Sequence, residues 1–326
     1  MNVPVPPERP ILQVTDLTVR YATRQGDVHA VDAVSLDLLP GQVLALVGES
    51  GCGKTSLAMA LMRLLPDNAR LVSGRVLLDG NDLAAMDENE LRTFRWKRIS
   101  MIFQAAMNSL DPVYRVADQI IEALTTHFPD MSTNATREKV ADLFELVGLD
   151  PDLAGRYPHE FSGGMRQRAV IAMAMACQPD VIIADEPTTA LDVIVQDRIL
   201  RGLKDIQRES AAGILYITHD MAVAAEVSDH IGVMYAGKLV EMGPTPKVFA
   251  RAIHPYAASL MSASPSIKGE KRELAALPGE PPNLISPPTG CRFHPRCALA
   301  TPICGQEEPP IVNRDGHWAA CWNPLS

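Results

Sequence analysis

The chain has 326 residues, a net charge of −9, a hydrophobic content of 47% and a charged content of 21%, values typical of a globular protein with one large domain and an appendage, or with two domains. The negative charge argues mildly against a nucleic-acid partner. No apolar run approaches the roughly 20 residues that span a bilayer, and the Pro-rich residues 1–10 lack the apolar core of a secretion signal. We therefore expect a cytosolic protein that meets a membrane only through a partner.

The chain opens with patterns that predict β-strands. Residues 11–14 and 17–21 alternate partly between apolar and polar side chains, and a hairpin-like return follows at 30–36. Further along, residues 74–83 contain the Asp-Gly turn of a β-hairpin. These segments predict antiparallel strands near the start of the chain.

The stretch around which the chain is organised begins with an apolar run, residues 43–47, which leads into the pattern G-x-x-x-x-G-K-T and then into a helix-prone segment. This order of strand, loop and helix is the context that a phosphate-binding loop requires. Glycines let backbone N–H groups point at phosphate oxygens, and the helix N-terminus adds its positive dipole end. The residues expected to bind nucleotide are Gly48, Glu49, Ser50, Gly51, Cys52, Gly53, Lys54, Thr55 and Ser56.

Specific roles are expected for three side chains near this loop. Lys54 would bridge the β- and γ-phosphates, and the Thr55 hydroxyl would hold Mg²⁺. Tyr21 either packs on its sheet or stacks on a purine base, and the loop that follows it favours stacking. A chance glycine-rich turn is the competing interpretation of the loop. The strand before it and the helix after it favour a nucleotide triphosphatase.

Polar side chains follow two of the later predicted strands. Residues 98–104 end on Gln104, and an apolar run at 181–184, expected to be buried, delivers Asp185 and Glu186. Catalytic groups of parallel α/β sheets lie at the carboxyl ends of strands. We therefore expect Gln104 to reach Mg²⁺ or the attacking water and Asp185 to orient the Mg²⁺ shell. Glu186 would polarise the water that attacks the γ-phosphate.

A third strand end carries a histidine. The buried run at 213–218 is followed by His219, and a hairpin is predicted at 231–241. A lone histidine at the end of a strand is usually structural. Because His219 is the third polar group placed at a strand end beside a nucleotide, we expect it to contact the γ-phosphate.

Between these strands, residues 106–176 predict a helical insertion. Apolar residues have helical spacing at 116–126 and 136–147, and Gly148 is expected to end the second helix. A long helix from about 165 to 176 completes the insertion.

Ser162, Gly163 and Gly164 stand at the start of that last helix. A capping hydroxyl, bare backbone donors and a helix dipole would form a second anion site, although the same residues also suit an ordinary turn and cap. Two phosphate-binding surfaces and a single nucleotide motif suggest that each surface acts on the nucleotide of a different copy.

Together these motifs resemble the ATP-binding cassette (ABC) family over about residues 11–250. The family's motifs match the phosphate loop at 48–55, the Q-loop residue Gln104, the signature at 161–167, the second nucleotide motif at Asp185 and Glu186, the D-loop at 189–192 with Asp192, the switch histidine His219, and the adenine-stacking aromatic Tyr21. The signature reads Phe-Ser-Gly-Gly-Met where Leu-Ser-Gly-Gly-Gln is commoner, and Ala105-Ala106 replaces a common Glu-Pro. Neither departure removes a group that hydrolysis needs.

The resemblance implies an α/β fold: a P-loop NTPase (RecA-like) ABC nucleotide-binding domain with a helical subdomain, an antiparallel β subdomain and a small cysteine-rich C-terminal extension. It also implies a head-to-tail dimer of two cassettes that sandwiches two ATP molecules, each held by one phosphate loop and the partner's signature. Closure of such a dimer would drive two transmembrane permease subunits. The expected boundaries are a flexible start at 1–10, the ATPase domain at 11–250 with its helical subdomain at about 106–176, and the extension at 251–326.

The C-terminal extension, residues 251–326, is called the tail below. It contains four of the six cysteines, Cys291, Cys297, Cys304 and Cys321, spaced C-x5-C-x6-C-x16-C. Such a spacing in a cytosolic chain does not indicate disulfides, and four thiolates suit Zn²⁺ or an iron–sulfur cluster. The usual C-x2-C zinc pairs are absent, and His294 and His317 are alternative ligands. A Pro-rich linker precedes the cysteines, so a metal would hold together a tail that has little else to do so.

This tail is similar to the C-terminal extension of oligopeptide and dipeptide importer ATPases, from His254-Pro255-Tyr256 through residues 290–297. The resemblance implies a 4Fe–4S cluster rather than zinc. It also implies the energy-coupling ATPase of an importer with a solute-binding protein, attached peripherally to the cytoplasmic face of the inner membrane and paired with a paralogue or an identical chain. Oligosaccharides are the alternative solute, and a soluble ABC ATPase without transport is the alternative class.

Overall fold

The computed structural model describes residues 9–104, 109–188, 193–263 and 279–326. The chain divides into two compact units. The first comprises the start of the chain to residue 11 with residues 39–42 and 85–215, and the second comprises residues 12–38, 43–84 and 216–326.

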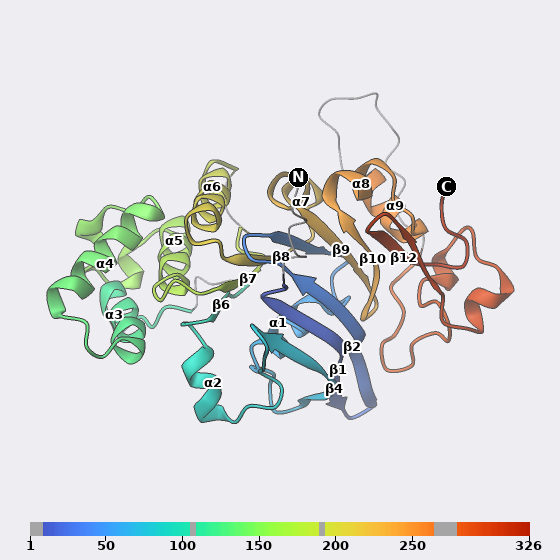
Figure 1. Ribbon diagram of the computed structural model, residues 1–326, viewed down its shortest axis with the longest axis horizontal. Helices are drawn as coiled ribbons and strands as arrows, with labels where there is room; N and C mark the ends of the chain where they lie inside the picture. Colours follow the sequence, from blue (N-terminus) through green and yellow to red (C-terminus); the bar gives the residue numbers. More distant parts are fainter. Residues whose placement is uncertain (1–8, 105–108, 189–192, 264–278) are drawn as a thin grey trace, which may run out of the picture. The chain divides into compact units, whose positions relative to one another are not determined.

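The first unit contains the predicted helical insertion. Its helices are α2 (Glu88–Phe94), α3 (Val116–His127), α4 (Thr133–Leu146), α5 (Gly163–Ala174) and α6 (Val193–Ser210), with the 3-10 turns η2 (Pro151–Leu153) and η3 (Pro158–Glu160). Helices α3 and α4 confirm the two predicted segments, and Gly148, at φ 68°, lies just beyond the end of α4. Helices α3, α4 and α5 lie side by side in the green part of Figure 1.

The strands of the first unit are buried. They are β6 (Ile99–Ile102), β7 (Val181–Asp185) and the first half of β8 (Gly213–Thr218), whose last three residues belong to the second unit. Strands β6 and β7 pair in parallel from Ile99 and Val181 to Ile102 and Ala184. Both strands therefore end at the same edge, which brings the residues that follow them together.

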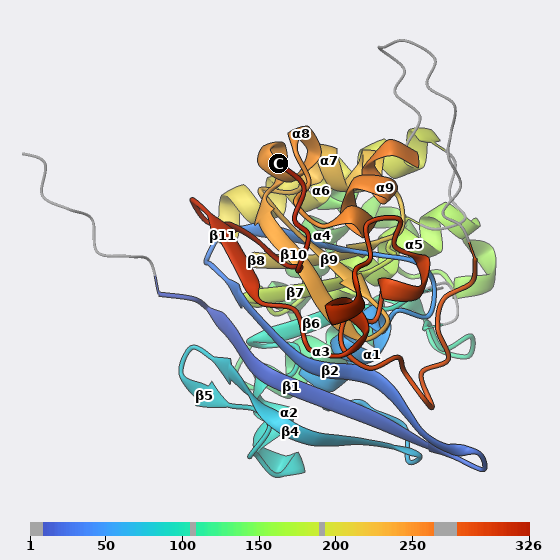
Figure 2. The same cartoon turned by 90° about the vertical axis from the view of Figure 1, so that its right-hand side faces the viewer.

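In the second unit, the strands predicted near the start of the chain form an antiparallel sheet in the order β2-β1-β4-β5. They are β1 (Leu12–Thr23), β2 (Gly26–Leu38), β4 (Ala69–Leu78) and β5 (Asn81–Asp82). The two predicted segments 11–14 and 17–21 lie in one continuous strand, and the gap between them is an irregularity of that strand, where the register shifts between Val14 and Leu17 and Asp16 adopts φ 48°. Strands β1, β2 and β4 run side by side in Figures 1 and 2.

The second sheet of this unit joins the phosphate loop's strand to the C-terminal tail. Strand β3 (Val43–Val47) pairs in parallel with β9 (His230–Tyr235), and β9 pairs with β10 (Lys238–Pro244) as the predicted hairpin. Strand β12 (His317–Ala320) then pairs with β10, and β11 (Ile311–Arg314) pairs with β12. The tail thus extends this sheet, in contrast to the expectation that it had little to hold it together (Figure 2).

The remaining helices of the second unit are α1 (Lys54–Leu61), α7 (Met221–Val227), α8 (Thr245–Ala250) and α9 (Pro255–Ala263), with the 3-10 turns η4 (His294–Arg296) and η5 (Pro302–Gly305). Within the described ranges, no helix has the length and apolarity needed to cross a membrane.

An aromatic cluster fixes the tail to the rest of the second unit. Tyr235 at the end of β9, Tyr256 in α9 and Phe293 before η4 are each at most 2% exposed. The ring centroids of Tyr235 and Phe293 are 5.2 Å apart at 84°, and those of Tyr256 and Phe293 are 5.3 Å apart. Each such pair contributes about 0.5–1.5 kcal/mol beyond its buried area, so the tail is anchored by core packing as well as by strand pairing.

A buried carboxylate joins three segments of this unit. Glu241 in β10 is 0% exposed and accepts hydrogen bonds from the N–H groups of Ile253 (2.9 Å) and His254 (2.6 Å). Its other contact is with Nε2 of His317 in β12, at 2.6 Å. Burial raises the pKa of Glu241, and these three contacts oppose that rise. The carboxylate links β10, β12 and the start of α9.

We expect stability to depend on pH through His254. Its ring is 1% exposed, its Nδ1 accepts a hydrogen bond from the N–H of Tyr256 at 3.0 Å, and desolvation lowers its pKa from 6.5 to about 4. Between about pH 4 and pH 6.5, the ring is therefore neutral in the folded chain and protonated in the unfolded chain. The stabilising contribution is complete above pH 6.5 and decreases as the pH falls toward 4, by about 2 kcal/mol at pH 5.

The measurement is chemical denaturation of wild type and His254→Asn between pH 7.5 and 5. The asparagine carbonyl can still accept the hydrogen bond from Tyr256, so the variant isolates the titration. We expect the free energy of unfolding to fall less steeply with decreasing pH in the variant. Parallel pH profiles of the two proteins would contradict this assignment.

Candidate functional site

The predicted phosphate loop follows β3 and leads into α1. Its glycines adopt backbone conformations that other residues rarely adopt: Gly48 has φ 153°, Gly51 has φ 78° and Gly53 has φ 107°. A Cβ atom at Gly48 would collide with the carbonyl oxygen of Met234, and one at Gly53 with the carbonyl oxygen of Ala30. At Gly51 a Cβ would meet no atom within 4 Å. Two of the three glycines are therefore required by close backbone approach as well as by conformation.

The loop encloses its own lysine. Lys54 is 6% exposed, and its Nζ donates hydrogen bonds to the carbonyl oxygens of Gly48 (2.7 Å) and Glu49 (3.1 Å). Its Nζ also lies 3.6 Å from Sγ of Cys52, whose pKa is raised by burial. Thr55, in the first turn of α1, is exposed. The loop thus brings together a lysine ammonium group, a glycine-rich backbone and an exposed threonine, the residue types that a Mg²⁺-bound triphosphate requires.

Two further predicted residues lie in the second unit. His219 follows β8 and is exposed, and the next residue, Asp220, caps α7 by accepting from the N–H of Ala222 at 2.8 Å. Tyr21 lies near the end of β1, opposite Val28 of β2 and Ala69 of β4, and is half-buried. The roles predicted for His219 and Tyr21 stay predictions.

In the first unit, the structure brings two predicted residues into contact. Nε2 of Gln104, which follows β6, donates a hydrogen bond of 3.0 Å to Oε2 of Glu186, which follows β7. Glu186 has φ 47°, and Asp185 beside it is 1% exposed. Residues 82 positions apart in the chain meet because their strands are parallel and end at one edge.

The signature segment begins α5. Ser162 is the N-cap, and its Oγ accepts a hydrogen bond from the N–H of Met165 at 3.3 Å. Gln167, further along the same helix, is 5% exposed, and its Nε2 donates to the carbonyl oxygen of Pro187 at 2.6 Å. The signature helix therefore holds the segment that carries Glu186, a role for Gln167 that the sequence did not indicate. Asp192 and the rest of the predicted D-loop lie outside the described residues.

The prediction of a 4Fe–4S cluster in the tail is wrong. Over residues 9–104, 109–188, 193–263 and 279–326, no group of three or more His, Cys, Asp or Glu side chains is arranged to hold a metal ion, which also removes the zinc alternative. Burial raises the pKa values of Cys291 and Cys297, and raises that of Cys321 to about 11. Burial thus disfavours the thiolate, the form in which cysteine binds a metal.

The fourth cysteine and the two histidines have other contacts. Sγ of Cys304 accepts a hydrogen bond from the N–H of Thr301 at 3.4 Å, and Nδ1 of His294 lies 2.9 Å from the carbonyl oxygen of Cys291. His317 contacts Glu241. Cys304 and His317 are buried and bonded to protein groups, which is the physical reason why the cysteine spacing misled.

Residues of the tail that sequence reasoning did not single out contact the phosphate loop. The hydroxyl oxygen of Tyr256 accepts a hydrogen bond from the N–H of Glu49 at 2.9 Å, and Arg296 forms an ion pair with the carboxylate of Glu49 at 2.7 Å. Both residues stand in the sequence segments that carried the resemblance of the tail. Their types alone gave no indication of these contacts.

The chain matches two family models: "ABC transporter" over residues 31–189 and "Oligopeptide/dipeptide transporter, C-terminal region" over residues 240–304. It is 45% identical over 317 residues to the dipeptide transport ATP-binding protein DppD of Bacillus subtilis, covering 96% of this chain and 94% of that protein. It is 44% identical over 322 residues to the oligopeptide transport ATP-binding protein OppD of Salmonella typhimurium, covering 98% of this chain and 95% of that protein.

Among solved structures, the chain is similar to the dimeric bacterial ABC transporter cassette MJ0796, including its post-hydrolysis state bound to ADP and Pi. Each match has a TM-score of 0.66 and 26% identity, and covers 72% of this chain and 98% of that chain. With relatives at this identity along nearly its whole length, the chain belongs to the ABC transporter family, in the branch of the oligopeptide and dipeptide transport ATP-binding proteins.

Proposed function

We propose that this chain is the ATP-hydrolysing subunit of a binding-protein-dependent importer of peptides. The observation that carries the proposal is the combination of a complete phosphate loop with Glu186 held by Gln104 at the end of two parallel strands. The names of its relatives, dipeptide and oligopeptide transport ATP-binding proteins, support peptides as the solute. Oligosaccharides are the alternative solute of the same machine.

ATP and Mg²⁺ fit the residues of the loop. Backbone N–H groups of residues 48–56 would cradle the phosphates, because the positive φ angles of the glycines let the backbone curl around an anion. Lys54, which now donates to loop carbonyl oxygens, would turn to the β- and γ-phosphates, and Tyr21 would stack on the adenine. Mg²⁺, held by Thr55, Gln104 and Asp185, would neutralise charge that develops on the phosphates.

Glu186 is the residue that would act on the attacking water. Its carboxylate accepts from the amide of Gln104, so one oxygen is fixed and the carboxylate is oriented. A carboxylate in this position would accept the proton that the water loses as it attacks the γ-phosphate. His219 would contact the γ-phosphate. Catalysis on this account is positioning and electrostatic stabilisation, without a covalent intermediate.

The full site would include a second cassette. Ser162, Gly163 and Gly164 at the start of α5, with Asp192, would close over the nucleotide of a partner subunit, either a paralogue or an identical chain. The similar cassette MJ0796 has been solved as a dimer, which supports this arrangement. Two permease subunits and a solute-binding protein would complete the importer. The chain would then associate peripherally with the membrane, at its cytoplasmic face.

Glu186→Gln separates nucleotide binding from hydrolysis. The amide cannot accept a proton from water, so we expect ATP turnover of the assembled importer to fall by at least about a hundredfold, since a positioned base contributes roughly 10² to 10⁴. ATP binding and closure of the cassette dimer should be retained. Steady-state hydrolysis and equilibrium binding of Mg·ATP provide the two measurements. Undiminished turnover in this variant would contradict the role of Glu186.

Glycines of the loop provide a matched pair of variants. Gly53→Ala would place a Cβ against the carbonyl oxygen of Ala30 at φ 107°, whereas Gly51→Ala has a less unfavourable φ of 78°, nearer the left-handed region, and open space around it. We expect Gly53→Ala to abolish detectable Mg·ATP binding and Gly51→Ala to weaken it only in part. Isothermal titration of each full chain, with melting temperature as the control for folding, makes the comparison. Equal losses in both variants would show that conformation alone, without the close contact, explains the glycines.

A further inference from the structure

The tail binds the phosphate loop through Arg296. In η4, Nη1 and Nη2 of Arg296 donate to Oε2 and Oε1 of Glu49 at 2.7 and 3.0 Å, which makes a two-pronged ion pair. The arginine side chain is 6% exposed and the glutamate side chain 25%. Nη1 also donates to the hydroxyl of Tyr235 at 3.2 Å, and the guanidinium lies 5.7 Å from the centre of that ring. Bidentate pairs of this kind fix direction as well as distance.

The backbone of the same loop residue is held by a second element. The N–H of Glu49 donates to the hydroxyl of Tyr256 in α9 at 2.9 Å, and Tyr256 is 0% exposed within the aromatic cluster. Pro281, Pro282 and Leu284 of the tail line a small cleft together with loop residues 49–52. Side chain and backbone of Glu49 are thus both fixed by residues beyond position 254.

Arg292, at the other end of the same turn region, supports the loop from a second direction. It donates to the carbonyl oxygen of Ala236 and forms an ion pair with Asp32 of β2. Gly237, which follows Ala236 in the β9–β10 turn, donates its N–H to the carbonyl oxygen of Cys52 in the phosphate loop at 2.8 Å. Arg292 therefore holds the β9–β10 turn that in turn holds the loop.

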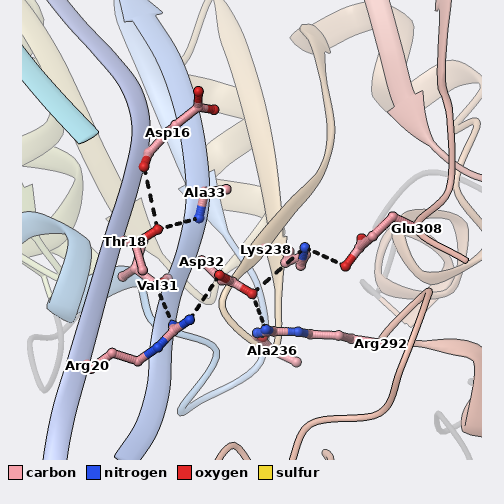
Figure 3. A network of polar contacts seen from close by, with 10 residues as sticks. All are labelled: Asp16, Thr18, Arg20, Val31, Asp32, Ala33, Ala236, Lys238, Arg292 and Glu308. Carbon is pink, nitrogen blue, oxygen red and sulfur yellow. Dashed lines mark hydrogen bonds and ion pairs between the residues drawn. The ribbon is translucent and has the colours of Figure 1, made fainter. Parts of the chain in front are cut away.

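Figure 3 shows that Asp32 is shared between several cations. Arg20 of β1 lies 3.2 Å from one carboxylate oxygen, while Arg292 and Lys238, the latter at 3.8 Å, contact the other. Lys238 also pairs with Glu308 of the tail at 2.8 Å. These cations hold the pKa of Asp32 below its usual range, although burial opposes them. The network joins the antiparallel sheet, the β9–β10 turn and the tail.

The charge of Glu49 makes its pairing important for nucleotide binding. Its carboxylate, on a side chain that is 25% exposed, belongs to the loop that would bind a triphosphate, and like charges repel more strongly in a partly buried site than in bulk water. The guanidinium of Arg296 cancels that charge, and its hydrogen bonds to Glu49 raise its own pKa above the ordinary value. Lysine would supply the charge but not the planar, two-pronged contact.

We propose that Arg296 of the C-terminal tail is a positioning residue of the ATP site, which neutralises and orients Glu49 so that the phosphate loop is held ready for the nucleotide. The inference rests on the proposed ATP site and adds a role for the tail in nucleotide binding. It does not involve the cysteines of the tail.

The test is a double-mutant cycle on the full chain, with Mg·ADP as the ligand and titration calorimetry as the measurement. Arg296→Gln should weaken Mg·ADP binding by at least about fivefold, the lower end of typical coupling between sites. The same substitution in a Glu49→Gln background should have a markedly smaller effect, because no unpaired carboxylate then remains in the loop. Arg296→Lys should lie between wild type and Arg296→Gln.

The matched control is Arg314→Gln. Arg314 lies in β11 of the same tail and donates to the carbonyl oxygen of Leu325 at 2.8 Å, away from the loop, so Mg·ADP binding should be unchanged. Hydrogen exchange supplies a second readout: in Arg296→Gln, amides of residues 49–53 should exchange faster while those of β11 and β12 keep their protection. In the assembled importer, KM for ATP should rise more than kcat falls.

Three outcomes would overturn the inference. They are Arg296→Gln binding Mg·ADP like wild type, effects of Arg296→Gln and Glu49→Gln that simply add, and faster exchange throughout the tail instead of in the loop. Failure of the proposed function looks different, because wild type itself would then bind no Mg·ADP and hydrolyse no ATP. If Arg296→Gln fails to fold, the cycle with Arg296→Lys and Glu49→Gln replaces it with the same criteria.

Discussion

The close approach of neighbouring backbone to the phosphate loop is the constraint on which the second unit depends. Gly48 touches the carbonyl of Met234 and Gly53 that of Ala30, while the carbonyl of Cys52 receives the N–H of Gly237. A loop of small residues has few side chains with which to fix its own shape. Strand β2, strand β9 and the β9–β10 turn supply that shape, so whatever holds these segments also determines how the loop meets phosphate.

The tail acts on the same segments through charge. Core packing of Phe293 with Tyr235 and Tyr256, together with the pairing of β12 with β10, attaches the tail, and aromatic contacts stabilise without desolvating any ion. Buried ion pairs, in contrast, are weak evidence for stability because desolvation offsets much of their attraction. The pairs of Arg292 with Asp32 and of Arg296 with Glu49 are therefore better explained by orientation and charge neutralisation than by attachment.

The sequence was sufficient to predict the parts of the site that follow from local order. A buried run before Gly48 and a helix after Thr55 specify strand, loop and helix, and the structure has them as β3 and α1. Because the carboxyl ends of parallel strands meet at one edge of a sheet, the sequence also predicted that Gln104 and Glu186 lie close together, and the two side chains are in direct contact. It did not indicate Gln167, because a glutamine inside a helix has no local pattern that distinguishes a buried donor to Pro187 from a solvated side chain.

The structure of the tail depends on contacts between segments that are distant in the sequence. Strands β11 and β12 have four residues each, too short to be distinguished from loop by alternation, and they exist because β10 offers an edge with which β12 pairs. The cluster hypothesis started from four cysteines and a family resemblance, and it was strengthened by the premise that little else holds this tail. Strand pairing, the aromatic cluster and the carboxylate of Glu241 remove that premise, since each contributes what a metal was invoked to supply. Cysteine spacing describes how far apart thiols lie along the chain, whereas ligation requires their sulfur atoms to converge, and only tertiary packing decides that.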